Sequence, residues 1–258
     1  MTDKTEVSLI FKQYPILLPD AFKAFSICNK NAINAPELFA LINADPILTA
    51  ISYGMYHEFF PNFSQKFFGI PRIIVTLGIN TVKSFIGDIA RRGLSSPELS
   101  LRMSEQNDFL YRSLSTAIVS HLIAKERGIS ESELQEYYCA GLLYNIGECI
   151  VADYSGSKFN VPRETVAKEE AGRLAAALWG FPFSAAAAAS HNVEKCDAAL
   201  NAELAAHILT VTGGGQDVDG ELFKRLDVPV NVFQRIKQPF VLELKRLELF
   251  MGLGGGGD

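Results

Sequence analysis

The sequence predicts an all-α fold, and three observations support this prediction. Apolar residues recur at helical spacing along most of the 258 residues, capping residues and Gly or Pro breaks separate these segments, and strand signals are few. Apolar residues make up 48% of the chain and charged residues 21%, so a sizeable core can form. We therefore expect a compact bundle of helices packed by ridges into grooves.

The N-terminal part is expected to contain several helices joined by short turns. Apolar spacing predicts a first helix over 17–30. Asn34 and Asp45 are predicted to be the N-caps of the next two helices. The aromatic stretch 59–68 is expected to be a loop or a broken helix, and a further helix is expected to run to Ile89.

The second part of the chain is predicted to follow a connection at 91–100, which contains Gly, Ser and Pro. A long helix is expected from about Glu105 to Arg127. The next helix is expected to begin near Ser130, because Ser130 and Glu133 have the spacing of a capping box. The later helices are expected at 164–179, 184–190, 201–212, 220–226 and 231–251, with breaks at 156–162 and 213–215.

Strand signals are confined to two short stretches. Residues 73–75 and 208–211 have the composition of short strands, but both fit helix ends equally well. No βαβ pattern and no repeat of fixed period occurs.

Composition and missing motifs exclude several classes of protein. The net charge of −5 argues against a nucleic-acid scaffold, and no apolar run is long enough for a membrane span. The N-terminus lacks a secretory h-region and the four cysteines form no CxxC motif, so we expect a cytoplasmic chain with neither nucleic acid nor membrane as a partner. Phosphate-loop and zincin motifs do not occur.

The most informative stretch is the small, apolar run 138–151, which carries the polar pair Tyr144–Asn145. We expect one helix to carry this pair deep into the core. A polar pair inside such a run is either buried with partners or points into a cleft.

Four stretches in order resemble the HDOD family, a regulatory branch related to the HD phosphohydrolases. They are NADPILT at 43–49, IVTLGIN at 74–80, LLYNIG at 142–147 and WGFP at 179–182, the last followed by His191. The resemblance covers most of 17–212 and implies an all-α, multi-helix bundle related to the HD phosphohydrolase fold. It implies one continuous unit: an N-terminal helical subdomain at 1–95, a degenerate HD-like core at 96–215, and C-terminal helices with a flexible glycine-rich end at 216–258.

The resemblance also indicates where metal ligands of an HD site would lie. Those positions carry Arg112, Tyr144–Asn145, Lys168, His191 and Asn192, so only one histidine remains. A tyrosine phenol ionises near ~10 and arginine keeps its proton, so these side chains are poor metal ligands. We therefore expect no metal, no cofactor and no catalytic residue at this site.

Two interpretations of the basic residues stay open. In the first, Arg112 and Lys168 supply the positive charge of an anion pocket, and Asn145 and His191 donate hydrogen bonds. In the second, which we prefer, Arg112 pairs with an acid such as Glu148 and Lys168 is a solvated helix residue.

The resemblance to the HDOD family implies a non-enzymatic regulatory module of bacterial signalling, which is expected to act through protein partners or by sensing a small ligand. One alternative is a metal-dependent phosphohydrolase or phosphodiesterase of the HD superfamily. A second alternative is a sensor that binds an anionic nucleotide in the metal-free cleft. The leucine-rich segment 242–250 is expected either to pack on the domain or to mediate a homodimer.

Overall fold

The fold is helical throughout the part of the chain that the computed structural model describes, which is residues 21–30, 33–61, 69–94, 103–155, 167–212 and 220–251. No strand occurs in these ranges, and residues 73–75 and 208–211 are helical. The α-helices are α2 (Ala21–Cys28), α3 (Ala35–Asn43), α4 (Pro46–Phe59), α5 (Ile70–Leu77), α6 (Ile79–Leu94), α7 (Met103–Glu126), α8 (Leu134–Leu143), α9 (Ile146–Ser155), α10 (Lys168–Leu178), α11 (Phe183–Ala189), α12 (Asp197–Thr212), α13 (Gly220–Leu226) and α14 (Val232–Met251), with a 3₁₀ turn at Val193–Lys195.

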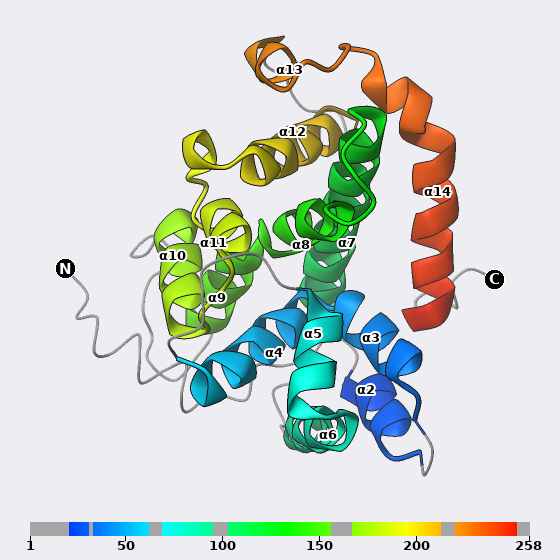
Figure 1. The fold of residues 1–258 in the computed structure, drawn as a ribbon, viewed down its shortest axis with the longest axis vertical. Coiled ribbons are helices and arrows are strands. Elements are labelled where there is room, and N and C mark those ends of the chain that lie inside the picture. Colours follow the sequence, from blue (N-terminus) through cyan, green and yellow to red (C-terminus); the bar gives the residue numbers. More distant parts are fainter. Residues whose placement is uncertain are drawn as a thin grey trace.

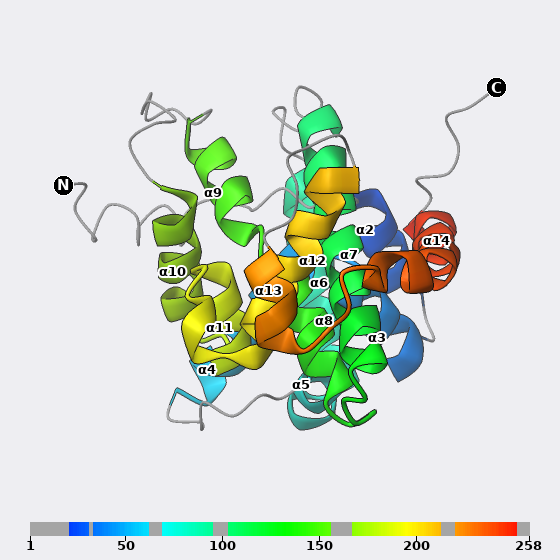
Figure 2. The same cartoon turned by 90° about the horizontal axis from the view of Figure 1, so that it is seen from above.

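Helix α7 runs through the middle of the molecule, and the other helices are arranged around it (Figure 1). Helices α2 to α6 gather at one end. Helices α9, α10 and α11 lie on one side of α7, and α14 lies on the opposite side, an arrangement that both views show (Figure 2).

Local signals define several helix ends as the sequence predicts. The Asn34 side chain accepts a hydrogen bond of 2.8 Å from the backbone N–H of Glu37 at the start of α3. The Asp45 carboxylate accepts bonds of 2.7 Å and 3.0 Å from the N–H groups of Ile47 and Leu48, which start α4. Both predicted N-caps are confirmed, because an Asn or Asp oxygen satisfies N–H groups that have no partner within the helix.

Two predictions about the segment around the polar pair are wrong. Ser130 does not begin a helix: residues 131–133 form a turn, and α8 begins only at Leu134. The Ser130 hydroxyl donates to the Glu133 carboxylate instead of capping the backbone. The expected single helix through 138–151 is divided into α8 and α9, because Tyr144 and Asn145 form a turn between them.

Helix α8 contacts the group of helices α2 to α6 through its polar side chains. The Tyr53 hydroxyl of α4 lies 3.3 Å from the Cys139 sulfur, and the Tyr138 hydroxyl donates to the Asn43 carbonyl at 3.0 Å. The Gln135 amide donates to the Asn43 side chain at 2.7 Å. The hydrophobic core that contains α2 to α6 also includes Leu143 and residues of α9 to α11. The division into three parts stays a prediction.

Other boundaries differ modestly from those expected. Helix α6 continues to Leu94, into the expected connection at 91–100, and Gly78 (φ 84°) separates it from α5. Helix α12 begins at Asp197, four residues before the predicted start. The helix start near 17, the rest of the connection, the loops at 156–162 and 213–215, the helix start at 164 and the glycine-rich end lie outside the described residues.

Within the described ranges, no single helix is long and apolar enough to cross a membrane. Two pairs of consecutive helices meet that test only when taken together, and they are bent by 114° (α3 with α4) and 108° (α5 with residues 79–91 of α6).

Candidate functional site

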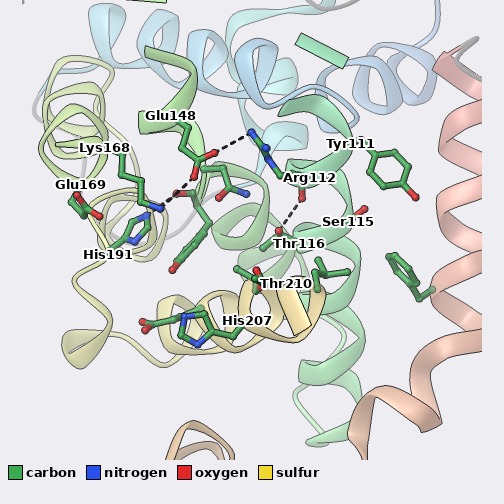
Figure 3. A pocket seen from close by; sticks show the side chains of 16 residues that line it. Tyr111, Arg112, Ser115, Thr116, Glu148, Lys168, Glu169, His191, His207 and Thr210 are labelled. Atoms are coloured by element: carbon green, nitrogen blue, oxygen red, sulfur yellow. Dashed lines mark hydrogen bonds and ion pairs between the residues drawn. The ribbon is translucent and has the colours of Figure 1, made fainter. Parts of the chain in front are cut away.

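A shared carboxylate lies at the centre of the candidate site. Arg112 of α7 donates to one oxygen of Glu148 at 3.1 Å, and Lys168 of α10 donates to the other at 3.3 Å. Figure 3 shows the two cations reaching the Glu148 carboxylate from opposite sides. The ion pair between Arg112 and Glu148 was expected from the sequence, but Lys168 is more than a solvated helix residue, because it binds the same acid.

The three charged groups line a cavity of about 760 Å³. This volume is within the range of about 300–1,000 Å³ that is usual for small-molecule sites. Four α7 side chains face the cavity at helical spacing, and α12 and α14 complete its wall. Besides Arg112, Glu148 and Lys168, the lining residues are Tyr111, Ser115, Thr116, Tyr144, Asn145, Glu169, His191, Glu203, Ala206, His207, Leu209, Thr210 and Phe240.

The polar pair forms part of the cavity wall at the turn between α8 and α9. Tyr144 is 6% exposed, and its ring stacks on that of His191 with centroids 4.2 Å apart. His191 has a φ of 52°, and its Nε2 lies 3.3 Å from the Tyr144 carbonyl oxygen. Burial raises the pKa of Tyr144, so its phenol stays protonated at neutral pH. Burial lowers the pKa of His191, with a smaller contribution from the positive charge of Lys168.

Close backbone contact between α9 and α10 brings Lys168 next to Glu148. A Cβ atom added to Gly147 would lie 1.9 Å from the carbonyl oxygen of Lys168, and one added to Gly172 would lie 1.8 Å from the Ala189 oxygen. Only glycine permits these approaches, because any side chain would collide with backbone atoms. The first residue of α10 is thereby held beside the first turn of α9.

One hydroxyl in the wall lacks a hydrogen-bond partner. Ser115 is 3% exposed, and its Oγ has no partner among the described residues. The neighbouring Thr116 hydroxyl donates back to the Arg112 carbonyl at 2.8 Å. A buried hydroxyl without a partner is uncommon, so Ser115 provides an unused hydrogen-bonding group at the cavity.

The structure brings together most of the residues that the sequence singled out. Arg112, Tyr144–Asn145, Lys168 and His191 all line the cavity. Asn192 is exposed and does not line it. Within the described residues, no group of three or more His, Cys, Asp or Glu side chains is placed to hold a metal ion.

Sequence reasoning missed the contribution of α12. Glu203, His207 and Thr210 come from this helix and line the cavity. Burial raises the pKa of Glu203, although His207 and Arg225 oppose this effect. Spacing of 3–4 residues does place these side chains on one face of α12, but nothing in the sequence indicates that this face meets Arg112.

Comparison with known proteins identifies the family. The model of the HDOD domain family matches residues 15–195, which is more than half of the chain. No curated protein and no solved structure matches the chain. The family match ends just before α12, so the cavity combines α7, α9, α10 and the turns at 144–145 and 191, inside the matched range, with α12 and α14 beyond it. The all-α fold agrees with the family match, and the chain belongs to the HDOD domain family.

Proposed function

We propose that this chain is a non-enzymatic regulatory module of bacterial signalling, which works in the cytoplasm through a protein partner or a small ligand. Membership of the HDOD family supports a signalling role. The proposal goes further than membership, because it states that the site performs no metal-dependent hydrolysis.

The observation that carries the proposal is the pairing of Arg112 and Lys168 with Glu148. These cations occupy two positions where the resemblance to HD enzymes implies histidine ligands. A metal centre needs neutral imidazoles and carboxylates with free lone pairs, but guanidinium and ammonium groups have none to give. Both cations would also repel a divalent metal, and they already neutralise the nearest carboxylate.

A second candidate function is the sensing of an anionic small molecule, and one observation favours it. The two cations line a cavity large enough for a small ligand. The HD phosphohydrolase alternative makes the opposite prediction, because it requires a metal and turnover.

The first test measures metal content and hydrolysis together. Protein purified without chelator is analysed for metals, before and after incubation with manganese, iron or zinc, and assayed with nucleotides and cyclic dinucleotides. We expect almost no retained metal and no metal-dependent hydrolysis. The variant His191→Ala serves as the control, because metal bound elsewhere on the protein survives this substitution. Tightly held, stoichiometric metal that His191→Ala removes, together with turnover, would refute the proposal.

A further inference from the structure

Glu148 occupies a position in which an external anion would fit. Its two oxygens each receive one cation, Arg112 at 3.1 Å and Lys168 at 3.3 Å, so two positive charges face one negative charge within this ion-pair cluster. Two further carboxylates, Glu169 and Glu203, line the cavity outside the cluster. The side chains of Arg112, Lys168 and Glu148 are 58%, 46% and 31% exposed. Ion pairs with this exposure contribute only about 0–1 kcal/mol, so an incoming anion can displace the carboxylate.

The cavity beyond this ion-pair cluster has features that suit a larger ligand. Ser115 provides a buried hydroxyl without a partner in the described structure, and it lines the same cavity as Arg112. Tyr111 and Phe240 add aromatic surface to the wall, and Tyr111 is 46% exposed. Figure 3 shows Tyr111 and Ser115 on the side of α7 nearer α14, away from Lys168. A ligand with an anionic head and a planar or apolar portion matches this distribution.

We propose that the cavity binds a small phosphorylated molecule whose phosphate replaces the Glu148 carboxylate on Arg112 and Lys168, so that Glu148 is a built-in competitor for the site. The inference rests on the proposed non-catalytic function, because it assigns both cations to ligand binding. A phosphate suits them better than a carboxylate does, since it carries about −1.5 to −2 charges and three acceptor oxygens. Arginine can also bind it through two parallel hydrogen bonds.

Displacement of Glu148 provides a route from ligand binding to a change in the fold. Glu148 is the residue of α9 that forms ion pairs with both α7 and α10. The contact of Gly147 with the Lys168 backbone keeps α9 against α10 when the ion pairs break. Ligand binding therefore replaces the direct ion pair between α7 and α9 by a bridge from α7 to α10 through the ligand, while α9 and α10 stay together. Such a change is the kind of two-state element through which a ligand can act on a partner.

The test is calorimetric titration of the full chain with inorganic phosphate and with adenosine monophosphate, in a buffer free of phosphate. Glu148→Gln removes the competing charge with little change in shape. We expect it to tighten binding of both probes several-fold, by about threefold to tenfold. The double variants Arg112→Gln/Glu148→Gln and Lys168→Gln/Glu148→Gln are expected to lose that gain. Adenosine monophosphate is expected to bind more tightly than phosphate, because its base reaches the aromatic wall.

Glu170→Gln is the matched control, because it releases an arginine of α10, Arg173, from an exposed ion pair outside the cavity. It changes the net charge as Glu148→Gln does, and it is expected to leave phosphate binding unchanged. Glu148→Asp retains the net charge but shortens the side chain, and a smaller gain in the same direction is expected. Circular dichroism confirms that each variant is folded.

Three outcomes would overturn the inference: Glu148→Gln binds phosphate no more tightly than the unmodified chain, Glu170→Gln gains as much, or the two probes bind equally well. These failures differ from a failure of the proposed function. Metal-dependent turnover would end the non-enzymatic assignment, whereas absence of both turnover and phosphate binding would overturn this inference alone.

Discussion

The Glu148 carboxylate holds two cations at the cavity wall, and His191 in the same wall is kept uncharged by its surroundings. Burial is the main cause of the lowered pKa of His191, and the charge of Lys168 acts in the same direction. Glu169, the hydrogen bond with the Tyr144 carbonyl and Glu148 act in the opposite direction, but the pKa is still lowered. A positive charge on His191 would place a third cation near Arg112 and Lys168. Repulsion between like charges and burial both disfavour the protonated form.

The lowered pKa predicts that acid weakens the fold through His191. In the unfolded chain a histidine has a pKa near 6.5, whereas folded His191 takes up its proton only at lower pH. Its contribution to stability is therefore complete above about pH 6.5 and is lost as the pH falls towards the folded pKa. We expect His191→Asn, which tolerates the positive φ, to reduce the loss of unfolding free energy between about pH 7.5 and about pH 5.5.

Urea unfolding at both pH values measures this effect. The pKa of His121 is also lowered by burial, so the double variant His121→Gln/His191→Asn is expected to flatten the pH dependence further. An unchanged pH dependence in both variants would show that neither histidine is kept neutral by the fold.

At the scale of helices, the geometry of the site depends on how closely α9 approaches α10. Gly147 allows the Lys168 carbonyl oxygen to lie where a side chain would otherwise be, and the backbone nitrogen of Gly172 would lie 2.9 Å from the same added Cβ. The colliding atoms belong to the backbone, so they cannot move aside by a change of rotamer.

We predict that Gly147→Ala pushes α9 and α10 apart and lowers the free energy of unfolding by about 1–3 kcal/mol. The substitution is also expected to weaken phosphate binding in the Glu148→Gln background, because Lys168 moves away from Arg112. Urea unfolding measures the first effect, with Gly220→Ala as the control, since a Cβ there meets no atom within 4 Å. Equal stability of the two variants would mean that the close approach is not needed.

At the scale of the whole molecule, one arginine joins the family-matched region to the helices beyond it. Arg127, which follows α7 and is 13% exposed, binds both oxygens of Asp197 at 2.8 Å and 2.9 Å. It also donates to the Asn201 side chain at 3.3 Å and to the Leu226 carbonyl at 3.1 Å. The Tyr137 hydroxyl donates to the same Asp197 carboxylate at 2.5 Å.

We predict that Arg127→Gln lowers the free energy of unfolding by about 2 kcal/mol, because it leaves acceptors on α12 and at the end of α13 without a charged donor. Arg235→Gln is the control: it breaks an exposed ion pair of 3.2 Å with Glu126 of α7 and should cost about 0–1 kcal/mol. Urea unfolding compares the two. A cost for Arg127→Gln no larger than that of the control would contradict the assigned role.

The arrangement around α14 shows a limit of sequence reasoning. The leucine-rich segment 242–250 was expected either to pack on the domain or to mediate a dimer, and Leu244 does pack in a core with α7 residues. Leu242 and Leu249 are nevertheless 63% and 76% exposed. Helical spacing identifies both faces, but only the packed structure determines which face meets α7. The homodimer stays a prediction.

The sequence alone was sufficient for the all-α class, the HDOD family, the caps at Asn34 and Asp45, and a minority of the residues that line the cavity. These features depend on residues a few positions apart or on motifs in a fixed order along the chain. Short stretches of sequence are therefore enough to predict them. Only the tertiary structure determined that Tyr144 and Asn145 interrupt a helix, that Asn192 lies outside the cavity, that Arg112 and Lys168 share Glu148, and that α12 completes the wall. Contacts between residues tens of positions apart are determined by how the helices pack, and a local pattern of polar and apolar residues does not specify that packing.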